Sequence, residues 1–287
     1  MKEIVVLSGK GGAGKTSITA AMFALTPSAL AVDADVDAAD LALLVGGSRI
    51  HGEIHLGRQV AVLDPETCRS CGRCAKVCAF GAIVMEQGHP KVDPAACEGC
   101  GACVQSCSAQ ALRMQRIATG TWEHRATRWG RLVHARLFPG EENSGRFVAF
   151  LREEGRRTAK ALGADWIWTD GPPGIGCAAI SSLSGADKVL LVVAPGASGL
   201  HDAARVLELA RQFGIPVDVV GNRSSRQDML DVQELAQQAG AQFLGAIARD
   251  EAFVEAEFSG SPVLETAPPA LQEQLRSLCE TIRKSIS

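Results

Sequence analysis

The sequence predicts an α/β fold, a mostly parallel sheet with helices on both faces, together with a small inserted α+β domain. Short apolar runs alternate with helical patterns along most of the chain, and this order is typical of a parallel sheet covered on both sides. Between residues 59 and 116 closely spaced cysteines replace that pattern. We therefore predict an α/β domain formed by 1–58 and 117–287, interrupted by 59–116, with 117–140 as a basic connecting segment.

Composition sets the first limits on function. The chain has 287 residues, 46% of them hydrophobic and 21% charged, as expected for a globular protein that buries a large core. A net charge of −3 argues against a dedicated nucleic-acid binder. No apolar run is long enough for a membrane span, and the N-terminus shows no signal-peptide pattern. We expect a cytoplasmic protein, in which ten cysteines would bind metal rather than form disulfides.

The first predicted strand, residues 2–8, leads through a glycine-rich turn into a predicted helix over 15–26. The turn matches G-x-x-x-x-G-K-[ST], in which backbone N–H groups and a helix N-terminus surround phosphate oxygens. Lys15 would contact the β- and γ-phosphates, and the Thr16 hydroxyl would hold Mg²⁺. The predicted ATP-binding residues here are Gly9, Lys10, Gly11, Gly12, Ala13, Gly14, Lys15, Thr16 and Ser17.

The remaining apolar patterns place polar side chains at strand ends. Strands are predicted over 30–32, 165–169, 187–194, 217–223 and 242–247, and helices over 38–45, 144–162, 199–213, 228–239 and from 268 onward. Asp33 and Asp35 follow one strand and Asp170 another, at the edge where α/β sheets bind ligands. Asp170 is predicted to hold Mg²⁺.

The polar residues at two strand ends leave alternatives open. The aspartates near residue 35 could cap the helix over 38–45 instead of serving the site, and Asp37 fits this role best. Asn222 could read an adenine edge with its carboxamide, or it could be an ordinary turn residue.

The cysteine segment is an internal duplication. The spacing C-x₂-C-x₂-C-x₃-C occurs twice, and each cysteine recurs 29 residues later. This is the spacing of two-cluster ferredoxins, in which the fourth cysteine of each run ligates the other cluster. We predict two [4Fe–4S] clusters, one on Cys68, Cys71, Cys74 and Cys107 and the other on Cys97, Cys100, Cys103 and Cys78. Two zinc sites are the alternative.

Residues 113–136 are rich in arginine, with Glu123 as the only acid. A solvated hairpin is the simpler interpretation. The alternative is a basic docking face for an acidic partner or redox protein.

Taken together, these motifs resemble the MinD/Mrp group of deviant-Walker P-loop ATPases, and more narrowly those with an inserted ferredoxin domain. The resemblance implies a homodimer with ATP or ADP and Mg²⁺ at the interface. It implies that Lys10 reaches the partner's phosphates, Asp33 positions the attacking water, Asp35 belongs to switch I and Asp170 to switch II. Catalytic roles thus fall to Lys10, Lys15, Asp33 and Asp170.

Three functions follow from this combination. The first is an ATPase that couples dimer changes to electron transfer through the two clusters, with an unidentified redox or metallocofactor protein as partner. The second is an ATPase for iron–sulfur or metal cofactor assembly, and the third a MinD/ParA-like switch with structural clusters. Cys177 follows the switch II segment and is either a core or helix-start thiol or a redox or transient-cluster residue at the interface.

Overall fold

The computed structural model describes residues 1–141 and 144–286. These residues form two compact units, one of 1–53 with 121–287 and one of 54–120. All eight clustered cysteines belong to the second unit, and the glycine-rich turn belongs to the first. The chain passes between the units twice, along strands β3 (Ser48–Leu63) and β6 (Leu112–Ala126).

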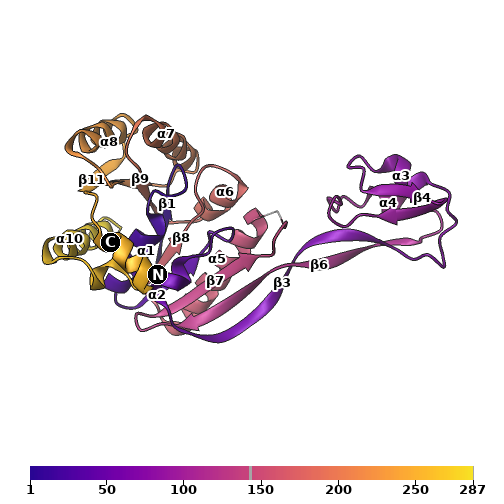
Figure 1. Cartoon of the computed structure of the whole chain (residues 1–287), viewed down its shortest axis with the longest axis horizontal. Coiled ribbons are helices and arrows are strands. Elements are labelled where there is room, and N and C mark those ends of the chain that lie inside the picture. The colour runs from indigo at the N-terminus through magenta and orange to yellow at the C-terminus, as the bar shows by residue number, and fades with distance from the viewer. Residues whose placement is uncertain (142–143, 287) are drawn as a thin grey trace. The chain divides into compact units, whose positions relative to one another are not determined.

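The first unit is built on a mostly parallel sheet (Figure 1). Its strand order is β11-β10-β9-β1-β8-β2-β7-β6-β3. Strand β1 lies between β8 and β9, and β2 lies between β8 and β7, all in parallel register. The bounds are β1 (Lys2–Leu7), β2 (Ala29–Asp33), β7 (Arg131–Leu137), β8 (Trp166–Asp170), β9 (Lys188–Val193), β10 (Val217–Asn222) and β11 (Gln242–Ile247).

Helices cover both faces of this sheet because its strands are apolar on both sides. On β1, Ile4 and Val6 pack into one cluster, and Val5 and Leu7 into the opposite one. The first face is covered by α1 (Lys15–Leu25), α2 (Leu41–Val45), α9 (Ala252–Ser259), a 3₁₀ turn (Val263–Glu265) and α10 (Pro269–Lys284). The other face is covered by α5 (Ser144–Leu162), α6 (Cys177–Leu183), α7 (Ala197–Gln212) and α8 (Arg226–Gln238).

The predicted α/β architecture is confirmed, and most predicted elements end within about three residues of the observed ones. Sequence patterns missed α9. None of the helices in the described part of the chain combines the length and apolar character needed to cross a bilayer.

The interpretation of 113–136 as a solvated hairpin is wrong in part. Residues 131–137 form β7, an internal strand that pairs in parallel with β2. Leu132 and Val133 are fully buried. Arg131, His134 and Arg136 interrupt the apolar pattern in the sequence, but of these three only Arg136 is exposed.

The second unit repeats its backbone as well as its sequence. It contains α3 (Arg73–Val77), β4 (Ile83–Glu86), β5 (His89–Val92) and α4 (Ala102–Ser106). Left-handed backbone conformations occur at Ser70, Gly72 and Gly81 and recur 29 residues later at Gly99, Gly101 and Gln110. Burial recurs too, since Ile83 and Leu112 are each 4% exposed. The duplication in the sequence is therefore a duplication of local structure.

A buried ionic network joins α5 to the central strand β1 and to the end of α6. The Arg152 guanidinium is 2% exposed and donates to Glu3 Oε1 at 2.7 Å and to the carbonyls of Ser181 and Ser184. Arg156 and Thr169 also donate to the Glu3 carboxylate. A buried charge is tolerated here because hydrogen bonds replace the lost water.

We predict that Arg152→Met lowers the free energy of unfolding by about 3–5 kcal/mol, because it leaves the buried Glu3 carboxylate without its main partner. Urea unfolding followed by tryptophan fluorescence measures this effect in the first unit, which holds all four tryptophans. The control is Arg211→Met, which breaks an exposed pair with Glu208 and should leave the unfolding midpoint almost unchanged. Equal midpoint shifts in the two variants would contradict the proposed role of the network.

Candidate functional site

The glycine-rich turn joins β1 to α1, and its glycines are required by close approaches. Gly14 precedes the helix in a left-handed conformation, with φ of 89°, and a Cβ there would overlap the side chain of Asn222. A Cβ at Gly9 would overlap the backbone of Asp202 on α7. The turn therefore lies tightly between β10 and α7, with the N-terminus of α1 at its end.

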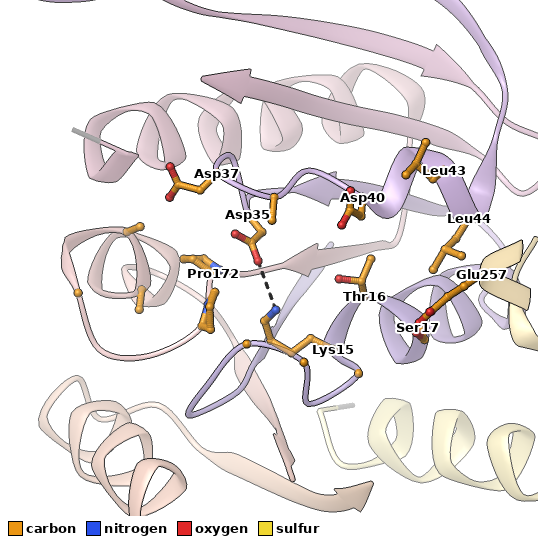
Figure 2. A pocket seen from close by; sticks show the side chains of 18 of the residues that line it. Lys15, Thr16, Ser17, Asp35, Asp37, Asp40, Leu43, Leu44, Pro172 and Glu257 are labelled. Atoms are coloured by element: carbon orange, nitrogen blue, oxygen red, sulfur yellow. Dashed lines mark hydrogen bonds and ion pairs between the residues drawn. The ribbon is translucent and has the colours of Figure 1, made fainter. Parts of the chain in front are cut away.

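A cavity of about 730 Å³ opens beside this turn, within the size range of small-ligand sites. Figure 2 shows Lys15, Thr16 and Ser17 facing Asp35, Asp37, Asp40 and Pro172 across it. The predicted residues that line it are Gly11, Gly12, Gly14, Lys15, Thr16, Ser17 and Asp35. Gly9, Lys10, Ala13, Asp33, Asp170 and Asn222 are not among the lining residues. Lys10 is half-buried, and its carbonyl accepts from the Ser8 hydroxyl at 2.7 Å.

Lys15 and Asp35 form a buried ion pair at the centre of this site. The Lys15 ammonium is 3.4 Å from Asp35 Oδ2, as the dashed line in Figure 2 marks. Burial raises the pKa of Asp35 to about 6, and the nearby Lys15 charge opposes that rise. A phosphate group entering the turn would compete with Asp35 for the Lys15 ammonium.

Asp33 and Asp170 lie side by side because they are register partners at the ends of β2 and β8. Both are fully buried. Burial raises the pKa of each carboxyl; at Asp33 the Asp170 charge raises the pKa further. Asp170 Oδ1 accepts from the Thr19 hydroxyl at 3.0 Å, and hydrogen bonds from Thr16 and Thr19 oppose the rise in its pKa.

One oxygen of each of these carboxylates, Asp33 Oδ1 and Asp170 Oδ2, has no hydrogen-bond partner among the described residues. Buried oxygens without a donor are costly, and a cation removes that cost. With Thr16 beside Asp170, the donor set fits Mg²⁺, which needs only one or two carboxylates when phosphates and water supply its other ligands.

The capping alternative for the aspartates is realised, but by a different residue. Asp33 Oδ2 accepts from the backbone N–H of Leu41, the first residue of α2, at 3.0 Å. The prediction that Asp37 fits this role best is wrong, because Asp37 is exposed and lines the cavity. Asp33 therefore ties the segment 34–40 to the end of β2.

The segment after Asp170 is attached to the start of the glycine-rich turn. The N–H of Gly171 donates to the Val6 carbonyl at 2.9 Å, and that of Gly174 to the Ser8 carbonyl at 2.8 Å. Pro172, Pro173 and Cys177 line the cavity from this side. Cys177 is exposed and is the first residue of α6, so it is a helix-start thiol and not a core thiol. Cys279 is buried near Thr26.

Asn222 positions the turn. Its Nδ2 donates to the Ala13 carbonyl at 2.8 Å, and its Oδ1 is buried without a partner among the described residues. Contact with an adenine edge stays a prediction. Sequence patterns missed its neighbour Arg223, which lines the cavity and donates to the Gly12 carbonyl at 3.1 Å. They also missed Glu257, because it lies on the unpredicted helix α9.

In the second unit, a separate small cavity is lined by Cys78, Cys97, Cys100 and Cys103. Backbone N–H groups of Ser70, Ala61 and Ala111 donate to the sulfurs of Cys68, Cys97 and Cys107 at 3.3–3.4 Å. Burial raises the pKa of the Cys74 and Cys103 thiols. Within residues 1–141 and 144–286, no three His, Cys, Asp or Glu side chains converge in a way that would hold a single metal ion.

We predict that Asp35→Asn changes the pH dependence of stability. The pKa of Asp35 in the folded protein, about 6, lies above its usual value of 3.8, so the protonated Asp35 favours the folded state fully below pH 4, and this contribution is lost as pH rises through 6. Relative to wild type, the free energy of unfolding of the variant should therefore rise by about 2–3 kcal/mol between pH 4 and pH 7. Urea titrations at several pH values test this. The exposed Asp37→Asn variant is the control, and a parallel rise in it would rule out Asp35 as the cause.

The chain is similar in sequence to known proteins. The chain is 32% identical over 232 residues to the uncharacterized protein MJ0578 of Methanocaldococcus jannaschii, covering 79% of this chain and 80% of that protein. It is 31% identical over 106 residues to the septum site-determining protein MinD of Bacillus subtilis, covering 34% of this chain and 40% of MinD.

The fold is similar to that of MinD from Pyrococcus horikoshii OT3 in complex with Mg-ADP. The TM-score is 0.60 at 19% identity, covering 98% of this chain and 95% of that one. Residues 4–263 match the family described as the CobQ/CobB/MinD/ParA nucleotide binding domain. With this match across most of the sequence and a glycine-rich turn of the expected form, the chain belongs to that family of nucleotide-binding P-loop proteins.

Proposed function

We propose that this protein is a Mg²⁺-dependent ATPase that acts as a nucleotide-controlled dimeric switch of the MinD/ParA kind. The observation that carries the proposal is the meeting of Lys15, Thr16 and Asp35 at one cavity, with Asp33 and Asp170 buried beside it. Mg-ADP in the Pyrococcus MinD structure supports the choice of ligand. The comparisons favour this switch function over one centred on electron transfer.

In this proposal each residue has a separate task. The glycine-rich turn and Lys15 bind the phosphates, while Thr16 and Asp170 hold Mg²⁺. Asp33 orients the attacking water, and Lys10 reaches the phosphates bound by a partner subunit, where it stabilises charge on the transferred phosphoryl group. The half-buried position of Lys10, outside the cavity lining of its own chain, is compatible with action on a partner.

The Lys15–Asp35 pair offers a physical link between nucleotide and conformation. In the structure, the Lys15 ammonium lies 3.4 Å from Asp35 Oδ2. A bound γ-phosphate draws Lys15 away, and the segment 34–40 loses that tether while Asp33 keeps its bond to α2. On the opposite wall, residues 171–174 are bonded to β1 and the turn, so both walls of the cavity respond to the same phosphate.

A second candidate function adds two [4Fe–4S] clusters in 54–120 and electron transfer coupled to the switch. The specific observation is the cavity whose four cysteines, Cys78, Cys97, Cys100 and Cys103, are the set predicted for one cluster. N–H donors to cysteine sulfur favour the thiolate form that binds iron. A cubane spreads its four irons over separate corners, so its ligands need not converge on a single ion. An ATPase that assembles iron–sulfur or metal cofactors, with the same two clusters, is the alternative to electron transfer.

We predict that Lys10→Ala separates nucleotide binding from turnover. Because Lys10 acts on the partner subunit, the variant should bind Mg-ATP within about threefold of wild type, stay monomeric with a non-hydrolysable ATP analogue, and hydrolyse ATP about 100-fold more slowly. Equilibrium binding, light scattering and phosphate release measure the three properties. Lys160→Ala, at an exposed position on α5, is the matched control. Wild-type hydrolysis by monomeric Lys10→Ala protein would refute the dimeric mechanism.

For the cluster function, we predict that anaerobically prepared protein holds about eight iron and eight sulfide per chain. Cys97→Ser should lose about half of this iron and one EPR signal, because only one set contains Cys97. Cys177→Ser, which changes an exposed cysteine outside both sets, should keep all of it. Two zinc ions and no sulfide would eliminate the clusters but leave the ATPase proposal intact. Identical cluster midpoint potentials with ADP and with the ATP analogue would eliminate nucleotide-coupled electron transfer.

A further inference from the structure

The two cysteine repeats of the second unit share a backbone but differ in surface charge. Arg69, Arg73 and Lys76 of the first repeat are all exposed. The residues 29 positions later in the second repeat are Glu98, Ala102 and Gln105. Since left-handed positions, helices and buried side chains recur at this spacing, the fold itself does not require the difference.

Apolar side chains follow the same asymmetry. Val77 is 39% exposed and Phe80 is 50% exposed, whereas their counterparts in the second repeat are Ser106 and Ala109. Exposing large apolar side chains to water is unfavourable, and a cluster of them marks an interaction surface. Met85 is also exposed and lies beside Gly72, directly before α3, so the apolar area extends along the first repeat.

These side chains occupy one region. Arg73 is three residues from Lys76 and four from Val77 on α3, a spacing that places side chains on the same side of a helix. Arg69 and the exposed Cys71 lie in the loop before α3, and Phe80 follows α3 in the chain, where it lines the small cavity together with Cys78 and Cys100. We define the first-repeat face as Arg69, Arg73, Lys76, Val77 and Phe80.

The positive charges of this face are not neutralised within the described part of the chain, where Arg69, Arg73 and Lys76 take part in no hydrogen bond or ion pair. The arginine-rich segment 113–136 differs. There Arg125 pairs with Glu123 and Arg128 with Glu265, and the two histidines bond to Glu154 and Glu123. Two of the six arginines of that segment are therefore paired, Arg125 and Arg128, whereas all three cations of the first-repeat face lack such a partner among the described residues.

We propose that the first-repeat face docks an acidic protein, and that the second repeat does not. Charge complementarity identifies the occupant, since three exposed cations accompany exposed apolar side chains in the first repeat, and specific protein interfaces combine apolar contacts with a charged rim. Nucleic acid fits less well, because the face offers few cations and the whole chain carries a net charge of −3. The docking of an acidic protein does not depend on the proposed clusters. Only the choice of a redox protein as the partner rests on them, because the partner would then contact the cluster loop Cys68–Cys78.

The test uses the full-length protein and a flavodoxin, a small acidic redox protein, as the probe. Binding is measured by calorimetry at about 20 mM and about 300 mM salt, because screening weakens contacts between exposed charges. One variant gives the first repeat the charges of the second, Arg69→Glu with Arg73→Ala and Lys76→Gln. Its control removes three other cations of the same unit, Lys91→Gln with Arg113→Gln and Arg116→Gln. A third variant, Val77→Ser with Phe80→Ala, tests the apolar centre.

We expect the charge variant to bind at least about tenfold more weakly at low salt and to lose most of its salt dependence. The control should stay within about threefold of wild type, and the apolar variant should weaken binding without changing the salt dependence. Transplanting the charges to the second repeat, Glu98→Arg with Ala102→Arg and Gln105→Lys, should strengthen binding. Circular dichroism and iron content establish that each variant is folded.

Four outcomes would overturn the proposal. The first is that the wild type does not bind flavodoxin at about 100 μM, and the second is that the charge variant and its control lose the same affinity. The third is that the same residues bind a labelled single-stranded oligonucleotide more tightly than flavodoxin. The fourth is that the wild type self-associates and the charge variant does not. Protein that lacks iron but still binds flavodoxin through this face would refute the cluster proposal and support the docking proposal.

Discussion

The arrangement of charge in the first unit depends on one constraint, the burial of Asp33 and Asp170 as register partners at the ends of β2 and β8. Two carboxylates cannot both remain charged and dry at this separation without compensation. Compensation comes from the Thr16 and Thr19 hydroxyls, the Leu41 N–H and the nearby Lys15 ammonium. These groups belong to the first two turns of α1 and to the start of α2, so the proposed binding of a cation and a phosphate would act on the same electrostatic balance that shapes the site.

The cysteine unit is connected to the sheet without breaking it. Residues between the end of α2 and the start of β7 leave and return along β3 and β6, and β7 then takes the internal position beside β2. An internal parallel strand must be apolar on both faces, and Leu132, Val133 and Ala135 meet this requirement. The insertion therefore leaves intact the strand order around β1, β8 and β2, on which the nucleotide site is built.

Repetition within the second unit makes its surface informative. The two repeats share left-handed backbone positions and buried side chains, so each repeat is a reference for the other. Where equivalent exposed residues differ, the shared fold does not account for the difference. One such difference is that the first repeat has Arg69, Arg73 and Lys76 at the positions where the second repeat has Glu98, Ala102 and Gln105. The proposed clusters would be held by the common features, and the proposed partner would be selected by the features that differ.

The sequence by itself determined the α/β architecture, the glycine-rich turn and the repeat, because these depend on local spacing and on apolar periodicity. It also indicated which aspartates end strands, since strand ends are local. Only the tertiary structure decided that β7 is an internal strand, that Asp33 rather than Asp37 caps α2, and that Lys15 pairs with Asp35. It also brought Arg223 and Glu257 to the cavity. Each of these facts depends on segments far apart in the chain, and the free energy of burying and pairing their side chains is set by neighbours that no local pattern contains.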